Sequence, residues 1–269
     1  MMLTVVCPGQ GSQRFLSGAL PFPIPDGADI DDTAIAQPLI VAASLSSFCT
    51  WFPSRGTADA ESQKPHLVAG HSVGMLAAFA IAGSYSFETA IELAKVRGQI
   101  FHDVAASSHS GMSALIGKNV AQVFSELDTV LEVAVVNSDS QIVVAGPVSE
   151  LHELAGNVPR GIRVTQLPVS GAFHTSAMLP AVAAFSEVLQ DVEIAQPTIP
   201  VISDLTGQII HDGVKEHLLT QITNPVRWDL VTQTIAASGA DQIVELAPSG
   251  TLTPLLKRAI PGVNVTQII

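Results

Sequence analysis

The feature that most restricts the fold is the segment Gly70-His-Ser-Val-Gly74, which stands between two apolar stretches of different character. Residues 66–69 before it are short and β-prone, whereas residues 75–82 after it are apolar and alanine-rich, as in a buried helix. A strand that passes through a tight, glycine-bounded turn into a buried helix is typical of parallel α/β sheets. The turn therefore predicts an α/β protein in which Ser72 lies at the carboxyl edge of the sheet.

The remainder of the chain supplies further elements for such a sheet. We expect strands over residues 3–7 and 242–246, and a strand with a Thr-Gly turn over 201–210. Helices are expected over 33–52 (after Pro38), 86–104, 180–192, 214–222, 227–237 and 251–258. Ser86 is the expected N-cap of its helix, and Arg97 falls at the margin of that helix's apolar stripe. Residues 21–32 are expected to form a surface loop, and residues 53–64 a polar linker.

Between residues 111 and 168 the pattern changes from long helices to short alternating elements. Strands are expected at 112–116, 133–137, 142–145 and 163–167, with helices at 120–131 and 148–157. This order, βαββαβ, is that of a ferredoxin-like unit. We therefore expect an inserted subdomain at residues 111–170, with residues 1–110 and 171–269 forming the main α/β core.

Composition excludes several classes of protein. A chain of 269 residues with 47% apolar and 13% charged residues is not disordered. The net charge of -12 and the absence of a basic run argue against a nucleic-acid or anionic-membrane surface. The most apolar window, residues 67–83, is too short and too interrupted to span a bilayer, and the N-terminus lacks the basic region of a signal peptide, so we expect a cytoplasmic protein.

The two cysteines are too few for a disulfide framework. Cys7 and Cys49 are expected to be reduced thiols in the core, although a single disulfide between them stays open. No HExxH motif or Cys/His ligand spacing occurs, so no metal site is predicted.

The motif G-x-S-x-G points to nucleophilic chemistry. It holds a serine on a strained turn with its hydroxyl exposed, and the following helix directs backbone N–H groups at an oxyanion formed over that serine. The alternative is a glycine-rich turn whose serine only caps the helix. A nucleophilic serine needs a base, and His174, in a loop between a strand and a helix, is the best placed candidate, because His71 adjoins Ser72 and would be turned away from it.

Several further blocks occur together, and with the elbow they resemble the malonyl-coenzyme A:acyl-carrier-protein transacylase family, the acyltransferases of fatty-acid and polyketide synthesis. The actinobacterial type is the most similar. The matching blocks, in the family's order, are Pro8-Gly-Gln-Gly-Ser-Gln13, Gly70-His-Ser-Val-Gly74, Arg97-Gly98, Gly111-Met-Ser-Ala114, Asn137 with Gln141-Ile-Val-Val-Ala-Gly146, Ser170-Gly-Ala-Phe-His174, Gln221 with Asn224-Pro-Val-Arg-Trp228, and Glu245-Leu-Ala-Pro-Ser-Gly-Thr-Leu-Thr253. They cover nearly the whole chain.

The resemblance implies an α/β-hydrolase-like core with a ferredoxin-like insertion, and a reaction without cofactors. Malonyl would pass from malonyl-CoA to the phosphopantetheine thiol of acyl carrier protein through malonyl-Ser72. Ser72 and His174 would form a catalytic dyad, with the backbone carbonyl of Gln221 orienting the histidine. The backbone amides of Gln10 and Val73 would form the oxyanion hole.

The resemblance also assigns residues to the substrate. Arg97 would receive the malonyl carboxylate through two parallel hydrogen bonds, which acetyl could not provide. Asn137 would also contact substrate, and Phe173 would fill the space that an α-methyl group needs. Without the resemblance, Arg97 would be interpreted as pairing with an acid elsewhere in the fold, and Phe173 as ordinary core packing.

One position departs from the family pattern, because Met75 stands where the family usually has glutamate. Two alternatives therefore remain: a serine thioesterase or hydrolase that releases the acyl group to water, and a non-catalytic acyltransferase-like partner subunit. Docking an acidic carrier protein on this acidic chain requires a local basic patch, for which Lys257, Arg258, Arg227 and Arg160 are the candidates.

Overall fold

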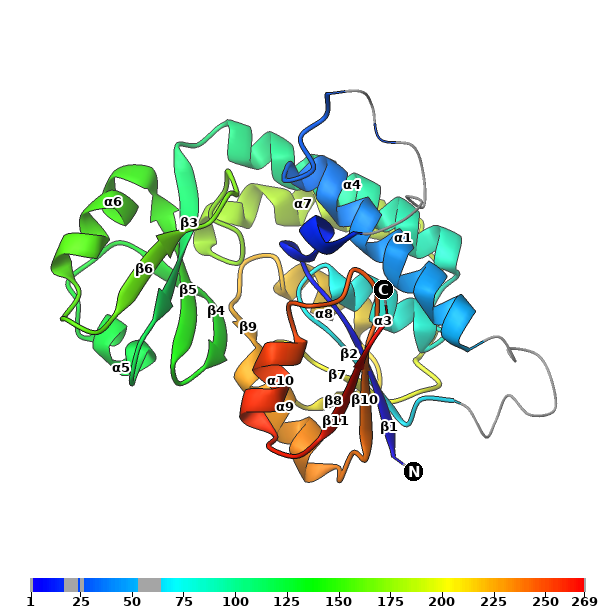
Figure 1. Cartoon of the computed structure of the whole chain (residues 1–269). Coiled ribbons are helices and arrows are strands. Elements are labelled where there is room, and N and C mark those ends of the chain that lie inside the picture. The colour runs from blue at the N-terminus through cyan, green and yellow to red at the C-terminus, as the bar shows by residue number, and fades with distance from the viewer. Residues whose placement is uncertain (1, 17–23, 25–26, 53–63, 269) are drawn as a thin grey trace.

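The computed structural model describes residues 2–16, 24, 27–52 and 64–268, and it contains two mixed β-sheets in an α/β fold (Figure 1). The larger sheet has the order β11-β10-β1-β2-β7-β8, in which only β8 runs antiparallel to its neighbour. Its strands are β1 (Leu3–Cys7), β2 (Leu67–Gly70), β7 (Val201–Ile202), β8 (Ile209–Ile210), β10 (Gln242–Glu245) and β11 (Asn264–Gln267). The mixed α/β architecture expected from the sequence is confirmed.

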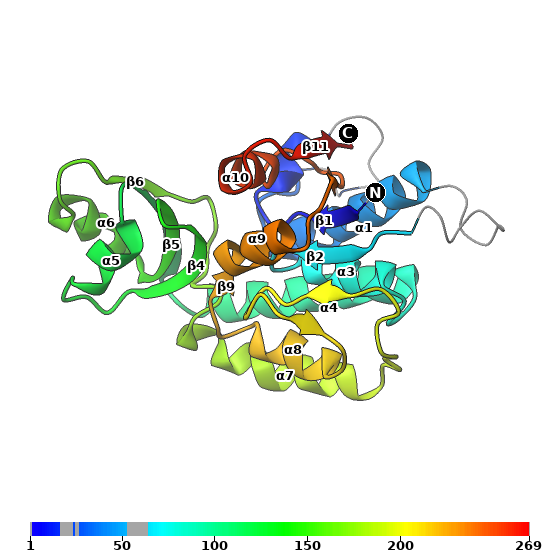
Figure 2. The same cartoon turned by 90° about the horizontal axis from the view of Figure 1, so that it is seen from below.

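The smaller sheet has the order β6-β3-β5-β4-β9 and forms a separate lobe with two helices on its outer side (Figure 2). Its strands are β3 (Ser110–Ile116), β4 (Glu132–Ser138), β5 (Gln141–Pro147), β6 (Arg163–Gln166) and β9 (Val226–Arg227). Its helices are α5 (Val120–Ser125) and α6 (Val148–Asn157). The last strand, β9, comes from the C-terminal part of the chain and runs parallel to β4.

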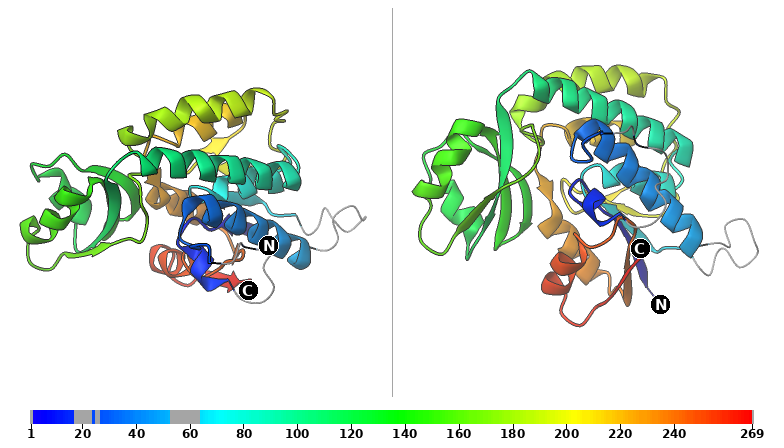
Figure 3. Two further views of the ribbon diagram at one scale, coloured as in Figure 1. Left: turned by 90° about the horizontal axis from the view of Figure 1, so that it is seen from above. Right: turned by 45° about the horizontal axis from the view of Figure 1, so that its top comes forward.

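The other helices surround the larger sheet. They are α1 (Thr33–Trp51), α3 (Gly74–Ile81), α4 (Phe87–Ala106), α7 (Leu179–Gln190), α8 (Val214–Thr220), α9 (Trp228–Ala237) and α10 (Thr253–Ala259), with short 3-10 turns η1 (Ser12–Phe15) and η2 (Ser176–Met178). Helices α1, α3 and α4 pack on one another, whereas α9 and α10 pack together on the other side of the larger sheet (Figure 3).

The central strand β1 determines where the loops gather. All five of its residues are buried, and it lies between β10 and β2, parallel to both. The carboxyl ends of β1 and β2 therefore meet at one edge of the sheet, and the loops that follow them touch. A Cβ on Gly74 would lie 2.3 Å from the Cys7 carbonyl oxygen, and one on Gly70 would lie 2.3 Å from the Gly74 carbonyl carbon. Only glycine fits at both positions.

The middle strands of the smaller sheet, β3 and β5, are buried on both faces, and the two faces belong to different cores. Leu115, Ile142 and Val144 pack with α5 and α6 in a separate apolar cluster. Ala114 and Val143, which point to the other face because side chains alternate along a strand, belong to the main core and line its cavity. This face of the smaller sheet is thus a wall of the cavity described below.

Several elements differ from the expectation. Helix α1 starts at Thr33, five residues before Pro38, because the Asp32 carboxylate caps it by accepting the Ala34 N–H at 2.9 Å. Pro38 removes a single hydrogen-bond donor from the helix. Helix α5 ends at Ser125 and not at 131, and β9 and β11 were not expected. The strand with a Thr-Gly turn expected over 201–210 is an antiparallel pair, β7 and β8, on either side of that turn. Ser86 caps α4 as predicted, accepting the Thr89 N–H.

The two cysteines differ in their exposure to solvent. Cys7 is a buried free thiol, as expected, but Cys49 is exposed on α1, so its assignment to the core was wrong. Helix α1 is long and apolar enough to cross a membrane by length and composition alone, yet 67% of its apolar window is buried inside the molecule, which accounts for its composition. The described residues of the loop expected at 21–32, which are 24 and 27–32, form no helix or strand, as expected, and residues 21–23, 25 and 26 lie outside the described residues. Of the linker expected at 53–64, only residue 64 is described.

The contact between α1 and α4 allows a direct test of the packing. A Cβ on Gly98 would lie 2.7 Å from the Thr33 carbonyl oxygen, whereas a Cβ on Gly156, also within a helix, meets nothing within 4 Å. We expect Gly98→Ala to destabilise the protein by about 1–3 kcal/mol through overpacking. Gly156→Ala should stabilise it by roughly 0.5–1 kcal/mol through its higher helix propensity. Thermal unfolding of both variants measures the difference, and equal shifts in Tm would contradict the close contact.

Candidate active site

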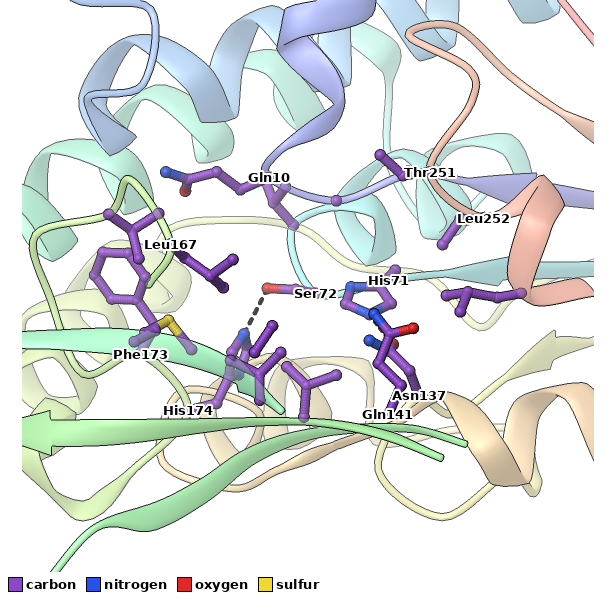
Figure 4. Close-up of a pocket in the computed structure, with 18 of the residues that line it drawn as sticks. Gln10, His71, Ser72, Asn137, Gln141, Leu167, Phe173, His174, Thr251 and Leu252 are labelled. Atoms are coloured by element: carbon purple, nitrogen blue, oxygen red, sulfur yellow. Dashed lines mark hydrogen bonds between the residues drawn. The ribbon is translucent and has the colours of Figure 1, made fainter. Parts of the chain in front are cut away.

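Ser72 and His174 face each other at the edge of the larger sheet. The Ser72 hydroxyl donates to His174 Nε2 over 2.6 Å (Figure 4). Ser72 lies in the turn between β2 and α3, and His174 lies in the loop between β6 and η2. Both have left-handed backbone conformations, with φ of 53° and 62°, which are uncommon for residues other than glycine. Such conformations cost roughly 1–3 kcal/mol and persist only where the surrounding structure imposes them.

The second ring nitrogen of His174 fixes its tautomer. Nδ1–H donates to the backbone carbonyl oxygen of Gln221 at 2.8 Å, so Nε2 is free to accept the serine proton. Burial, and to a smaller extent the positive charge of Arg97, lower the pKa of His174 to about 4. The imidazole is therefore neutral at pH 7, which is the protonation state that a general base requires.

Two backbone N–H groups next to Ser72 are available to a ligand. Among the described residues, the amides of Gln10 and Val73 have no hydrogen-bond acceptor, and both residues line the cavity. The Gln10 side chain is held away from Ser72, with Nε2 donating to the Asp31 carbonyl at 3.2 Å and Oε1 accepting from Thr33 at 3.0 Å. Gly9 allows this loop to press on the elbow, because a Cβ there would lie 2.6 Å from the His71 carbonyl oxygen.

Arg97 lies at the centre of the buried face of α4, and not at its margin as expected, with 1% of its surface exposed. Its guanidinium donates to the side-chain oxygens of Gln37 at 2.7 Å and Gln221 at 3.1 Å, and it sits 4.1 Å above the centre of the Phe101 ring. No carboxylate in the described part of the chain forms an ion pair with it, and two of its five N–H groups account for these bonds. Burial lowers the pKa of Arg97 to about 10, so it remains charged at pH 7.

The remaining predicted residues lie on opposite walls of the same cavity. Phe173 packs against Phe101, with ring centres 5.3 Å apart. Asn137, on β4, accepts a hydrogen bond from His71 Nε2–H at 3.3 Å. His71 is thus turned away from the Ser72 hydroxyl, as expected, yet it still lines the cavity. Burial lowers the pKa of His71, so it too is neutral at pH 7.

The cavity that joins these residues has a volume of about 410 Å³. It is lined on one side by Ser72, His174 and Arg97, and on the other by apolar side chains of the smaller sheet, with Arg258 also on its lining. Within the described ranges, no three His, Cys, Asp or Glu side chains are grouped as metal ligands. The sequence-predicted residues Ser72, His174, Gln10, Val73, Arg97, Asn137, Phe173 and Gln221 are all brought to this region.

Sequence reasoning missed two contributors. Gln37, from α1, holds Arg97, and it is the one long polar side chain in a helix of apolar and small residues, which was the available signal. Asp204, fully buried after β7, accepts the backbone N–H of Ser72 at 3.0 Å. Its signal was an acid inside the strand segment expected over 201–210. Met75, by contrast, is fully buried in the apolar core and is not among the residues that line the cavity.

Comparison with known proteins identifies the family. Residues 24–268 match the acyl transferase domain family. The malonyl CoA-acyl carrier protein transacylase of Mycobacterium tuberculosis is 37% identical, over 99% of this chain and 96% of that protein. A crystal structure of MCAT from Mycobacterium tuberculosis has a TM-score of 0.89 at 35% identity, covering 100% of this chain and 96% of that one. A malonyl-transacylase in complex with its type II PKS acyl-carrier protein has a TM-score of 0.85 at 25% identity, covering 100% and 96%. The chain therefore belongs to the acyltransferase family that contains the malonyl-CoA:acyl-carrier-protein transacylases.

Proposed function

We propose that this protein transfers the malonyl group from malonyl-CoA to the phosphopantetheine thiol of acyl carrier protein, supplying fatty-acid synthesis. The observation that carries the proposal is a single cavity in which a Ser72–His174 hydrogen bond faces a buried guanidinium with donors to spare. The names of the relatives support the same activity. We extend the proposal to a cytoplasmic location and to a reaction that needs no cofactor.

In the first half of the reaction, Ser72 Oγ attacks the thioester carbonyl carbon while His174 Nε2 takes the hydroxyl proton. The negative charge that develops on the carbonyl oxygen is received by the amides of Gln10 and Val73. One such donor contributes about 2.7–4 kcal/mol of transition-state stabilisation. The carbon–sulfur bond then breaks, His174 returns the proton to the departing coenzyme A thiolate, and malonyl-Ser72 remains.

The second half reverses these roles with a different thiol. His174 takes the proton of the phosphopantetheine thiol, the sulfur attacks the malonyl-Ser72 ester, and Ser72 recovers its proton from His174. The backbone carbonyl of Gln221 accepts a hydrogen bond from Nδ1–H in both halves, which orients the ring and stabilises the imidazolium. The histidine therefore does not need a carboxylate as the third member of a triad.

Arg97 supplies selectivity for malonyl in this proposal. Gln37 and Gln221 hold its guanidinium from two sides, and Phe101 supports one of its faces, so the group is pre-organised to receive a carboxylate. An acetyl group leaves the buried charge without a counter-ion. Phe173 narrows the same region by packing on Phe101, which disfavours acyl groups branched at the α-carbon.

The two sheets have different roles in this proposal. We propose that residues 1–110 and 171–269 form an α/β-hydrolase-like core that carries the dyad, and that residues 111–170 form a ferredoxin-like insertion that closes the cavity. Arg258 lines the cavity and Lys257 precedes it on α10, so this end of α10 is our candidate for the carrier-protein contact. Arg227 is a poorer candidate because Asp229 pairs with it at 2.7 Å.

Removing either member of the dyad tests the acyl-enzyme. Wild-type protein mixed with malonyl-CoA should gain the mass of one malonyl group on Ser72, measured by intact-mass spectrometry. Ser72→Ala should show no adduct, and His174→Ala should acylate at least about 100-fold more slowly, within the usual contribution of a general base.

The same experiment separates the alternatives. Persistence of the adduct without carrier protein supports a transferase, whereas rapid release to water supports a hydrolase. A wild-type protein that acquires no adduct would favour a non-catalytic subunit.

Substitution of Arg97 tests the selectivity. Arg97→Ala should lower the kcat/KM for malonyl transfer by about tenfold or more, since a hydrogen bond to a charged group contributes about 1.5–3 kcal/mol. Acetyl transfer should be preserved or raised. The control is Arg163→Ala, which removes an exposed arginine from the smaller sheet. Equal losses for both acyl groups would assign Arg97 a structural role only.

The pH dependence of acylation reports on His174. A histidine with its ordinary pKa of 6.5 would lose activity tenfold per pH unit below that value, whereas a pKa of about 4 keeps the base neutral at much lower pH. We expect the kcat/KM for Ser72 acylation to stay level from about pH 8 down to about pH 5. Stopped reactions analysed by mass spectrometry measure it, and a steep fall beginning near pH 6.5 would contradict the geometry.

A further inference from the structure

Asp204 is a buried carboxylate that contacts both the Ser72 elbow and Gln221. It follows β7 in the chain and is fully buried. Its Oδ2 accepts the backbone N–H of Ser72 at 3.0 Å and the side-chain amide of Gln221 at 2.7 Å, and its Oδ1 accepts His217 Nε2–H at 3.0 Å. Its own backbone carbonyl accepts the N–H of Arg227, which anchors the residue to β9.

These contacts connect the nucleophile to the group that orients the base. Gln221 donates from one side-chain nitrogen to Asp204 and to the Ser72 carbonyl oxygen, at 2.7 and 3.1 Å, while its backbone carbonyl holds His174. Both the elbow residue, with its strained φ, and the His174 ring are therefore held against the same carboxylate, one directly and one through Gln221. No other carboxylate in the described part of the chain contacts Ser72 or Gln221.

The charge of Asp204 matters as well as its shape. Its negative charge raises the pKa of three nearby groups, Arg97, His174 and His71. Burial lowers the pKa of all three by more, so Asp204 offsets part of that effect. His217 is the titratable group in contact with it. When His174 takes the serine proton, two positive charges, imidazolium and guanidinium, share a buried region, and Asp204 is the negative charge that offsets them.

We propose that Asp204 is a positioning residue for catalysis: it holds the elbow and Gln221 in place and stabilises the imidazolium that forms on His174. It touches neither the substrate nor the reacting atoms. Only the effect on malonyl transfer rests on the proposed function. The effect on the reactivity of Ser72 can be measured without malonyl.

The variant Asp204→Asn separates charge from shape. Its amide oxygen can accept the two hydrogen bonds that Oδ2 of Asp204 now accepts. Its amide nitrogen can donate to His217 Nε2 if the His217 ring carries its proton on Nδ1 instead, where Ser203 Oγ lies 3.5 Å away as an acceptor. The hydrogen-bond network then survives without the negative charge. The matched control is Asp212→Asn, which removes the same charge from an exposed residue near the start of α8.

The probe is phenylmethylsulfonyl fluoride. The Ser72 oxygen forms a bond to its sulfur, fluoride leaves, and the serine proton passes to His174 Nε2, so the rate of mass increase measures the dyad alone. We expect Asp204→Asn to slow labelling about tenfold, the equivalent of one pKa unit, and to move the half-maximal pH of labelling lower, since losing a negative charge lowers the pKa of His174. Asp212→Asn should label like wild type.

Labelling of Asp204→Asn at the wild-type rate with an unchanged pH profile overturns the proposal, even if malonyl transfer falls. A wild-type protein that labels normally but does not transfer malonyl refutes the proposed function and leaves this inference standing.

A second pair of variants applies if Asp204→Asn does not fold. His217→Gln keeps a neutral donor for Asp204 Oδ1, whereas His217→Leu removes it and releases one side of the carboxylate. We expect His217→Gln to label near the wild-type rate and His217→Leu to label at least about fivefold more slowly, in proportion to one lost hydrogen bond. Equal labelling rates for the two variants would overturn the proposal.

Discussion

The site depends on the contact between two neighbouring strand ends. Because β1 and β2 run parallel and adjacent, the loop after one and the elbow after the other meet at a distance that only Gly9 and Gly74 allow. This approach brings Gln10 and Val73, whose amides have no acceptor among the described residues, to the cavity that Ser72 also lines. The left-handed conformation of Ser72 is the local consequence of the same crowding, and Asp204 secures it from below by accepting the Ser72 N–H.

Burial of charge shapes the chemistry of the cavity. Arg97 is almost completely removed from solvent and forms no ion pair with a carboxylate in the described residues, so its guanidinium keeps donors for an anionic ligand. The same positive field, together with burial, keeps His174 neutral. A site that combines an unprotonated base with an unpaired cation suits a substrate whose reactive carbonyl lies two bonds from a carboxylate. Asp204 limits the cost of that arrangement when the base becomes charged.

Sequence alone predicted those parts of the molecule that are determined locally. The strand, turn and helix around Ser72 follow from apolar patterning and glycine positions, and the N-cap at Ser86 follows from its hydroxyl. The elements that sequence missed are those decided by partners distant in the chain. β9 is two residues long and exists because Val135 and Val136 of β4 pair with it, and Asp204 acquires its meaning only from Ser72 and Gln221. The family blocks bridged part of this gap, since they named Gln221 and Arg97 without showing that the two side chains touch.

The pairing of β9 with β4 has a mechanical consequence. The smaller lobe is joined to the rest of the molecule by its two chain connections, and also by a strand that arrives from nearly sixty residues downstream and continues directly into α9. This pairing adds a third connection between the smaller sheet and the rest of the molecule, beside the two chain connections. Because β4 also carries Val135 and Asn137, which line the cavity, the place of this wall depends on a strand from the C-terminal part of the chain.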